Sequence, residues 1–436
     1  MAAMLSEPRI TVLGPDPAHR RCILNGNAFQ QDAIVTFNAW QYAAFYSPLA
    51  FPEPLYIHLA RRPLPSGPWE ILVLSDYPQT VDDGHNTVQL GICPSDGTIH
   101  LSYDHHCDIL RYRVSVRSLA TKPSEFSWTE ALFTPTLNYL PGLPSTHSHF
   151  SYVTYPRFGF LGTDLFCSFR DGKAGLGNDH FYRYSGASGF WTFVGTPLTG
   201  VWSNPYVNGW DFRGGKIHVT WTWRGFVEYE GWDDLQDSKH KQQAGPNGAE
   251  NNFDVCYAWS EDGGETWRGE EGVVGRTVRT GAKGITAFEV PKGKGLMNQE
   301  AQAVDADGGV HVLNRDAADG GHLWKHYYRV PEGTWTRQQI QPITGGSRRG
   351  QLAISRDGDL FIILPDSTTT TIKIVKAAKS SGYATYEEVW TGHGFTGEPL
   401  IDSARLEHDN VLSVFIRGDV KGSAGKKNVV VLDFQL

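Results

Sequence analysis

The chain has 436 residues, of which 40% are hydrophobic and 20% are charged, and its formal net charge is −8. A negative net charge argues against the basic surface of a nucleic-acid-binding protein. No apolar run is long enough to span a membrane, so we expect neither a nucleic-acid nor a membrane partner. The five cysteines are dispersed without a C-x-x-C pair, which argues against a disulfide framework and a zinc ribbon.

A short repeat recurs along the chain: a glycine or Asp-Gly turn followed by alternating apolar residues, which is typical of a β-strand. In chain order the repeat begins at Asp96, Gly162, Gly214, Asp307, Asp357 and Asp409. One interval is nearly double the others, and it contains SEDGGETW, Ser260 to Trp267, which we take as a seventh marker. Seven markers predict an all-β fold, a seven-bladed β-propeller with about four strands per blade.

The segment SEDGGETW also matches the Asp-box pattern S-x-D-x-G-x-x-W. We expect a structural role, in which Asp262 binds backbone amides of a turn and Trp267 packs between strands. No segment combines a helical period with caps at both ends, so little helix is expected. The polar stretch from Gly231 to Asn252 predicts a long surface loop, of a kind that often borders a site.

The chain ends in the apolar strand NVVVLDFQL, Asn428 to Leu436. We expect this strand to pair with the N-terminal segment, which would close the ring and remove free sheet edges. Residues 1–436 are therefore interpreted as a single propeller domain, which we expect to be a monomer. The N-terminal segment lacks the apolar core of a signal peptide.

The first candidate segment runs from Asp82 to Arg113, and three of its four histidines, His85, His105 and His106, lie at predicted strand ends. His85 precedes one predicted strand, whereas His105 and His106 follow the next. Because neighbouring strands of a blade are antiparallel, all three can lie at the same end of the blade. Imidazoles titrate near neutral pH, so a pair of them suits acid–base catalysis. One histidine alone could equally cap a loop, but three histidines beside three aspartates favour a site.

The second candidate segment, His147 to Asn178, brings Tyr155 and Arg170 to the ends of consecutive predicted strands. The planar guanidinium of Arg170, followed by a glycine-rich loop, could bind a carboxylate through two hydrogen bonds. The phenol of Tyr155 could act as an acid or a base. Each residue also has an ordinary interpretation, as a solvated charge and a core aromatic.

The third candidate segment is HVTWTWRGF, in which Trp221 lies near Arg224 at a predicted strand end. A tryptophan beside an arginine suits a sugar face and an acidic group, although packing within the blade explains at least one tryptophan here. Arg315 occupies the equivalent place in a later blade. Four blades thus present a polar residue at equivalent strand ends, and packing alone does not require this convergence. We predict a central site that includes Trp221, Arg224 and Arg315 as substrate-binding residues.

The motifs DDGHN…DGTIHLSYDHH and TYPRF…SFRDG…GLGN, followed by HVTWTWR, resemble those of the BNR-type propeller polysaccharide lyases. These include the ulvan lyases and the rhamnose–glucuronate lyases that act on gum arabic and arabinogalactan. The resemblance extends from about Gln31 to Arg329 and is most specific in the first half.

The resemblance implies that His85 and His105 form the catalytic pair, that Tyr155 assists, and that Arg170 holds the uronate carboxylate. Some relatives have one histidine where this chain has His105 and His106. The base therefore stays open between these two, and His106 is otherwise expected to bind substrate.

The implied activity is β-elimination at the rhamnose–α-1,4–glucuronate linkage of arabinogalactan or gum arabic, releasing L-rhamnose and leaving an unsaturated glucuronate end. An ulvan-lyase activity is the alternative. An arginine would stabilise charge on the carboxylate while a histidine removes the C5 proton. We therefore expect an acidic polysaccharide as partner, no catalytic metal and no required cofactor, although Asp/Asn/Gly turns could hold a structural Ca²⁺. Such a function implies an extracellular location.

Two other functions fit a propeller. A sialidase-like glycoside hydrolase needs an arginine triad and usually several Asp boxes, whereas this chain has one clean Asp box and no proline in its Arg9-Ile10 opening. A non-catalytic glycan-binding propeller predicts aromatic residues at the mouth without a cluster of histidine, tyrosine and arginine. Product chemistry separates these functions, since only a lyase forms an unsaturated uronate.

Overall fold

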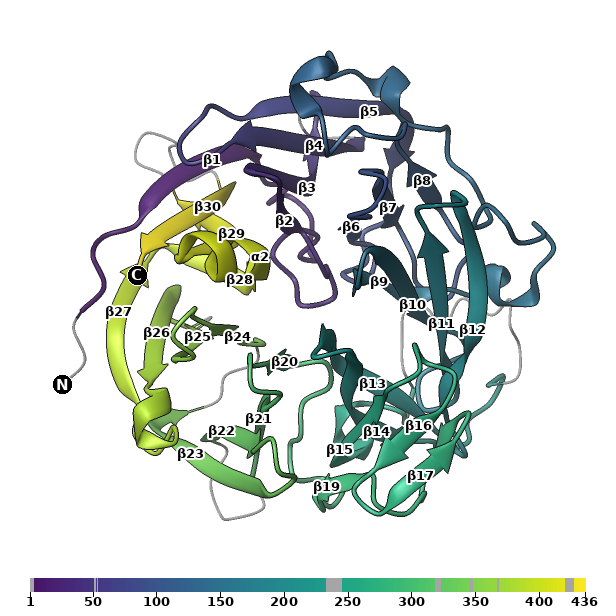
Figure 1. The fold of residues 1–436 in the computed structure, drawn as a ribbon, viewed down its shortest axis with the longest axis vertical. Helices are drawn as coiled ribbons and strands as arrows, with labels where there is room; N and C mark the ends of the chain where they lie inside the picture. The colour runs from purple at the N-terminus through teal and green to yellow at the C-terminus, as the bar shows by residue number, and fades with distance from the viewer. Residues whose placement is uncertain are drawn as a thin grey trace.

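The computed structural model describes residues 4–50, 52, 54–232, 245–317, 323–344, 348–366, 368–419 and 427–436. In these residues, seven β-sheets surround one central axis (Figure 1). The protein is therefore a seven-bladed β-propeller, as the repeats predict. None of the helices in the described residues is long and apolar enough to cross a membrane.

The blades are numbered in chain order, and each is given from its inner to its outer strand. Blade 1 has β2 (Ile34–Phe37), β3 (Trp40–Pro48), β4 (Leu55–Pro63) and β5 (Glu70–Gln79). Blade 2 has β6 (Val88–Ile92), β7 (Ile99–Tyr103) and β8 (Tyr112–Val114). Blade 3 has β9 (Thr154–Leu161), β10 (Asp164–Arg170), β11 (Asn178–Ser185) and β12 (Phe190–Thr199), with β18 (Val278–Arg279) added in parallel. Blade 4 has β13 (Ser203–Arg213), β14 (Lys216–Gly225), β15 (Asn252–Ser260), β16 (Trp267–Gly269) and β17 (Gly272–Gly275), and β19 (Thr286–Phe288) pairs with β15.

Blade 5 has β20 (Ala301–Val304), β21 (Val310–Asp316), β22 (Leu323–Arg329) and β23 (Trp335–Thr344). Blade 6 has β24 (Gln351–Ile354), β25 (Leu360–Asp366), β26 (Thr371–Ala377) and β27 (Glu387–His393). Blade 7 has β28 (Phe395–Ile401), β29 (Val411–Asp419), β30 (Lys427–Gln435) and, outermost, β1 (Arg9–Pro15). Helix is scarce in the described chain: α2 (Ser403–Asp409) and the short 3₁₀ turns η1 (Pro123–Glu125), η2 (Glu130–Leu132), η3 (Ser148–Ser151), η4 (Ala249–Asn251) and η5 (Lys379–Ser381).

Six of the predicted markers lead into the second strands of blades 2 to 7. The seventh does not mark a blade, because Ser260 to Trp267 forms the turn between β15 and β16 inside blade 4. The blade without a marker is blade 1, where Asn38 and Ala39 join the first two strands in left-handed conformation, with φ of 47° and 61°. Two such residues make a type I′ hairpin turn without an Asp-Gly pair. Blade 1 therefore lacks the repeat that marks the other blades.

The Asp box has the structural role predicted for it. Asp262 Oδ1 accepts a hydrogen bond from the amide of Thr266 at 2.9 Å, and Trp267 is fully buried. The centre of the segment predicted as a long loop, residues 233–244, lies outside the described residues.

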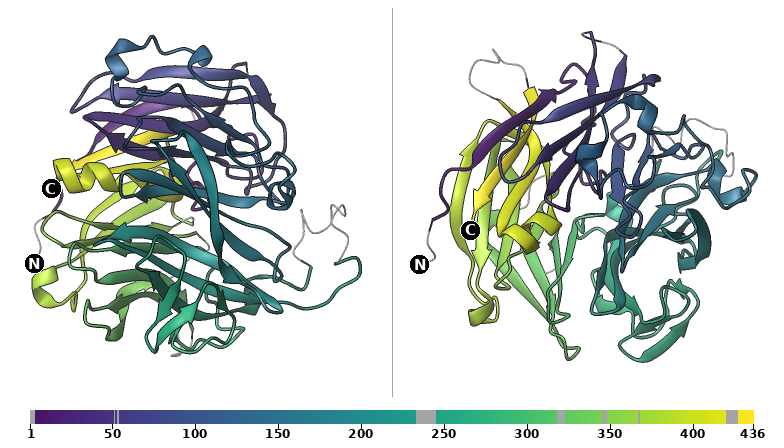
Figure 2. Two further views of the ribbon diagram at one scale, coloured as in Figure 1. Left: turned by 45° about the vertical axis from the view of Figure 1, so that its right-hand side comes forward. Right: turned by 45° about the horizontal axis from the view of Figure 1, so that its top comes forward.

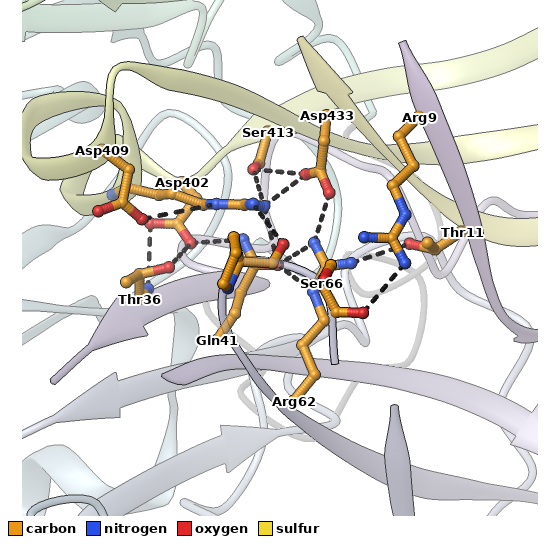
Figure 3. Close-up of polar contacts among 12 residues, drawn as sticks. Arg9, Thr11, Thr36, Gln41, Arg62, Ser66, Asp402, Asp409, Ser413 and Asp433 are labelled. Atoms are coloured by element: carbon orange, nitrogen blue, oxygen red, sulfur yellow. Dashed lines mark hydrogen bonds and ion pairs between the residues drawn. The ribbon is translucent and has the colours of Figure 1, made fainter. Parts of the chain in front are cut away.

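The ring is closed between blades 1 and 7. Strand β1 pairs antiparallel with β30, and the two lie side by side in the tilted views (Figure 2). Beneath them, Asp433 forms ion pairs of 2.6 Å with both Arg62 and Arg405 (Figure 3). Gln41 Oε1 accepts a further bond of 2.6 Å from Arg62 Nη2. The strand pairing and this buried network together join the two ends of the chain.

A cavity of about 630 Å³ opens where the inner strands end, and Asp32, Arg157, Asp211 and Gln302 are among its lining residues. None of the predicted site residues lines this cavity. The predicted site residues that come together lie instead around the starts of the inner strands β6, β9 and β13, at the opposite end of the axis. This cavity and the candidate site are therefore separate features.

Candidate active site

Two histidines at the edge of blade 2 share one aspartate. His85 lies in the turn before β6, and His106 follows β7. Asp83 Oδ1 is 2.5 Å from His85 Nδ1, and Asp83 Oδ2 is 2.6 Å from His106 Nδ1. The two imidazole rings are stacked with centroids 3.8 Å apart and an angle of 17° between their planes. The aspartate thus holds both rings in one orientation.

The charges in this group follow from burial and hydrogen bonding. Burial raises the pKa of Asp83, but hydrogen bonds from His106 and His85 outweigh burial and hold it well below its ordinary value. Burial and the neighbouring His85 lower the pKa of His106 to about 4, although Asp83 favours its charged form. At neutral pH, Asp83 is therefore ionised and His106 is neutral. Because Nδ1 of His106 donates to the carboxylate, its lone pair lies on Nε2, where it can accept a proton.

Asp83, His85 and His106 could also hold a metal, because their potential ligand atoms all lie within 4.8 Å of one another. The imidazole Nδ1 atoms and the carboxylate oxygens already lie at hydrogen-bonding distance from each other. A metal bound to these atoms would replace both hydrogen bonds.

Two arginines from blades 3 and 4 meet on one tyrosine. Arg170 ends β10, Arg224 lies near the end of β14, and Tyr206 is on β13 between them. Tyr206 Oη accepts hydrogen bonds from Arg170 Nη1 at 3.1 Å and from Arg224 Nη1 at 3.0 Å. Burial alone would raise the pKa of Tyr206, but Arg224 and Arg170 together bring it below its ordinary value. The phenol is therefore held in a strongly positive environment.

Neither Arg170 nor Arg224 forms an ion pair with a carboxylate of the described residues, although both are buried. Arg224 donates instead to the neutral side chains of Asn252 and Asn298, and Nε of Arg170 has no hydrogen-bond partner among the described residues. Burying two cations that have no ion-pair partner is costly. This arrangement therefore suits an anionic ligand, and the planar guanidinium groups suit a carboxylate.

Tyr155 connects the histidines to the arginines. Its ring centroid is 5.5 Å from that of His85 and 6.0 Å from that of Tyr206, and the guanidinium carbon of Arg170 lies 5.0 Å from it. Burial raises the pKa of Tyr155 well above its ordinary value, so the phenol stays protonated. Its backbone is left-handed, with φ of 57°. A bulky residue rarely adopts this conformation, and such strain concentrates at functional sites.

Phe29, in the connection between β1 and β2, covers the centre of this group. Its ring lies 5.3 Å from His85 and 4.8 Å from Tyr155. On its other side, the guanidinium of Arg349 lies 4.8 Å from the same ring, and Arg349 is ion-paired with Glu398 at 3.1 Å. Five blades and this connection therefore contribute side chains to one region around the axis.

The structure brings together five of the predicted site residues, namely His85, His106, Tyr155, Arg170 and Arg224, and places the other three elsewhere. His105 is 1% exposed, and its Nε2 accepts the amide of Arg111 at 2.8 Å. Burial lowers the pKa of His105 well below its ordinary value. The structure therefore does not support the prediction of His105 as the base, because His105 is buried, whereas His106 lies with Asp83 and His85.

The predictions that Trp221 and Arg315 bind substrate are also corrected. Trp221 is fully buried and packs edge-to-face on Trp223 with ring centroids 5.6 Å apart, so it cannot stack on a sugar. Arg315 is fully buried and forms an ion pair of 3.0 Å with Glu300. An arginine that already has a carboxylate partner offers no free charge to a substrate.

Sequence reasoning missed Asp83 and Tyr206 as site residues. Asp83 could have been found, because a carboxylate two residues before His85 can bond that ring locally. Tyr206 stands in the strand SNPYVNGWDFR, which carries no motif. Only the approach of Arg170 and Arg224 from two neighbouring strands reveals its role.

Polysaccharide lyases are among the known proteins that resemble this chain in sequence or fold. An ulvan lyase, long isoform, of Pseudoalteromonas sp. (strain PLSV) is 28% identical over 225 residues, covering 44% of this chain and 21% of that protein. The matched part is thus a small share of that longer protein. The structure of polysaccharide lyase Uly1 has a TM-score of 0.71 at 19% identity, covering 100% of this chain and 99% of that one.

A PL25 ulvan lyase bound to -[GlcA(1-4)Rha3S]- has a TM-score of 0.64 at 14% identity, covering 99% of this chain and 94% of that one. Both structural similarities concern the fold. The sequence profile of the BNR repeat-containing family matches residues 40–342, which is more than half of the chain. The protein therefore belongs to the BNR repeat-containing family.

Proposed function

We propose that this protein is a carbon–oxygen lyase that cleaves an acidic polysaccharide by β-elimination at a uronate. The observation that carries the proposal is the buried pair Arg170 and Arg224, which has no carboxylate partner in the described chain and lies beside a neutral histidine oriented by Asp83. A uronate supplies the missing carboxylate together with a weakly acidic C5 hydrogen for a base to remove.

The chemistry can be assigned to individual groups. Arg170 and Arg224 bind the uronate carboxylate and stabilise the charge that develops on it when the C5 proton leaves. Nε2 of His106 takes that proton, and Asp83 stabilises the imidazolium that forms. The C5–H electrons form the C4=C5 double bond, the C4–O4 bond breaks, and the Tyr155 hydroxyl protonates the departing oxygen. The products are an unsaturated uronate and a sugar with a new hydroxyl group.

For the substrate, we propose the rhamnose–α-1,4–glucuronate linkage of arabinogalactan or gum arabic. Elimination at this glucuronate would release L-rhamnose and leave an unsaturated end on the remaining glycan. The sequence motifs quoted above support this linkage. The similarity to ulvan lyases supports an ulvan-type uronate substrate equally.

Identification of the small products after incubation with gum arabic and with ulvan separates the two substrates. Free rhamnose together with an unsaturated glycan from gum arabic is the expected result. Unsaturated oligosaccharides from ulvan, with no product from gum arabic, would assign the ulvan-type substrate instead.

A further inference from the structure

A group of three aromatic rings, one exposed and two half-buried, lies next to the arginine pair. Trp202 is 59% exposed, and its ring centroid is 5.7 Å from that of Phe226 and 6.4 Å from that of Trp232. Phe226 and Trp232 are 5.2 Å apart, and the amide of Trp232 donates to the carbonyl of Tyr229 in the turn that presents it. We call Trp202, Phe226 and Trp232 the aromatic shelf.

The aromatic shelf is joined to the site by short stretches of backbone. Trp202 directly precedes β13, which carries Tyr206, and Phe226 comes two residues after Arg224. Two residues span at most about 7 Å. The amide of Phe226 also donates to the carbonyl of Trp202 at 2.9 Å, which fixes the two aromatic residues against each other. A chain molecule with its carboxylate on Arg224 would therefore reach the shelf with its neighbouring unit.

The conformation of Trp202 is unfavourable for folding alone. Its backbone is left-handed, with φ of 49°, which is an outlier for a bulky side chain. Most of its indole surface nevertheless faces solvent. Strained backbone and exposed aromatic surface are both costly to the free protein, and both are typical of a ligand-binding position.

The charges around the aromatic shelf differ between its two ends. Glu228 and Glu230, both exposed, lie in the segment between Phe226 and Trp232. The ammonium of Lys292 lies beside Gly225, which separates Arg224 from Phe226, and 5.6 Å from the ring of Phe253. Cations thus border the side that would hold the uronate, whereas the outer turn carries carboxylates that repel a sulfated sugar.

We propose that the aromatic shelf is a subsite for an uncharged pyranose linked to the uronate. The apolar C–H face of this sugar stacks on Trp202 and Phe226, while Glu228 and Glu230 disfavour a sulfate ester at the same place. This inference rests on the proposed function, and it favours polysaccharides in which the sugar next to the uronate is neutral.

The test measures binding in the background of His106→Ala, which prevents turnover during the titration. Trp202→Ala in this background should bind gum arabic about tenfold more weakly, which is the upper end of one aromatic contact. Trp202→Phe should recover most of the affinity. Phe190→Ala is the matched control, because Phe190 is 55% exposed on β12, in the outer part of blade 3, and it should leave the affinity unchanged.

A second measurement tests the selection by charge. The double variant Glu228→Gln, Glu230→Gln should bind ulvan about threefold more tightly at low salt, with unchanged affinity for gum arabic. Equal affinities of the Trp202→Ala and parent proteins would overturn the inference, while unsaturated products from the unaltered protein would still support the proposed function. No unsaturated product from either polymer would overturn the proposed function and the inference with it.

Discussion

Asp83 determines which nitrogen of each histidine can act as a base. Its carboxylate is within 2.6 Å of Nδ1 of both His85 and His106, so each Nδ1 carries the proton and each Nε2 carries the lone pair. The geometry resembles the orienting role that a carboxylate has toward a catalytic histidine in other enzymes. The adjacent His105 lacks such a partner and is buried.

Asp83→Asn should lower kcat by a factor on the order of 10³, because an amide cannot accept from both Nδ1–H groups and one ring adopts the wrong tautomer. The melting temperature should change little, since Asp83 and its partners are partly exposed. Steady-state kinetics and thermal unfolding measure the two effects. A folded His105→Gln variant serves as the control, and a comparable loss of kcat in it would return the base to His105.

The pH dependence of activity follows from the pKa of His106, which burial and His85 lower to about 4. A base must be unprotonated, so activity is present above this pKa and is lost as the pH falls through it. The acidic limb of kcat/KM should therefore have its midpoint near pH 4. Titration of the imidazole ring protons by NMR should show the same midpoint. A midpoint near 6.5, the ordinary value of histidine, would contradict the burial of a neutral His106.

Arg170→Lys should lower kcat as well as weaken binding, because lysine keeps the charge but loses the planar pair of donors. An interaction that strengthens as charge develops on the carboxylate affects the transition state more than the ground state. Arg213→Lys is a matched control, because Arg213 lines the cavity at the other end of the propeller axis and forms an ion pair with Glu407. A change in KM alone would make Arg170 a binding residue only.

At the level of strands, the pattern of apolar residues predicts the blades well. It predicts poorly the direction in which a side chain points at the end of a strand. If side chains continued to alternate beyond Tyr103, His105 and His106 would point to opposite sides of the strand. However, the backbone is left-handed at Asp104, with φ of 62°, and at Cys107, with φ of 52°. These residues break the extended conformation, so the sequence cannot show which histidine faces the site. The position of Tyr155 likewise depends on a left-handed backbone conformation, with φ of 57°.

Equivalent strand ends also differ in ways that sequence does not show. Arg170 is the last residue of β10 and Arg315 the last but one of β21, yet only Arg315 forms an ion pair within the described chain, with Glu300, which lies just before the neighbouring strand β20. Whether an arginine at a strand end is free for a ligand thus depends on whether a carboxylate comes within ion-pairing distance of it. The repeat predicted the place of both residues, and the packing between strands determined their different roles.

For the whole molecule, stability depends on the closure between blades 1 and 7. Asp433 is the shared anion of Arg62 and Arg405, and all three side chains are buried. Removal of one partner from a buried ion pair leaves an uncompensated charge and typically costs about 3–5 kcal/mol. The sequence predicts the strand pairing, but not this network, whose members are far apart in the chain.

Asp433→Ala should therefore lower the free energy of unfolding by about 3–5 kcal/mol, measured by denaturant titration. Asp409→Ala removes a carboxylate that lies 3.9 Å from the same Arg405 but is 43% exposed, and it should cost less than about 1 kcal/mol. Equal effects of the two variants would show that the buried network does not stabilise the closed ring.

The most direct test of the proposed elimination is the ultraviolet absorbance of the products formed from gum arabic and ulvan. An unsaturated uronate absorbs, whereas the product of hydrolysis does not. The unaltered protein should increase the absorbance with at least one of the two polymers, and His106→Ala should abolish the increase while remaining folded. New reducing ends without absorbance, or an undiminished rate in His106→Ala, would contradict elimination by the histidine and arginine groups described above.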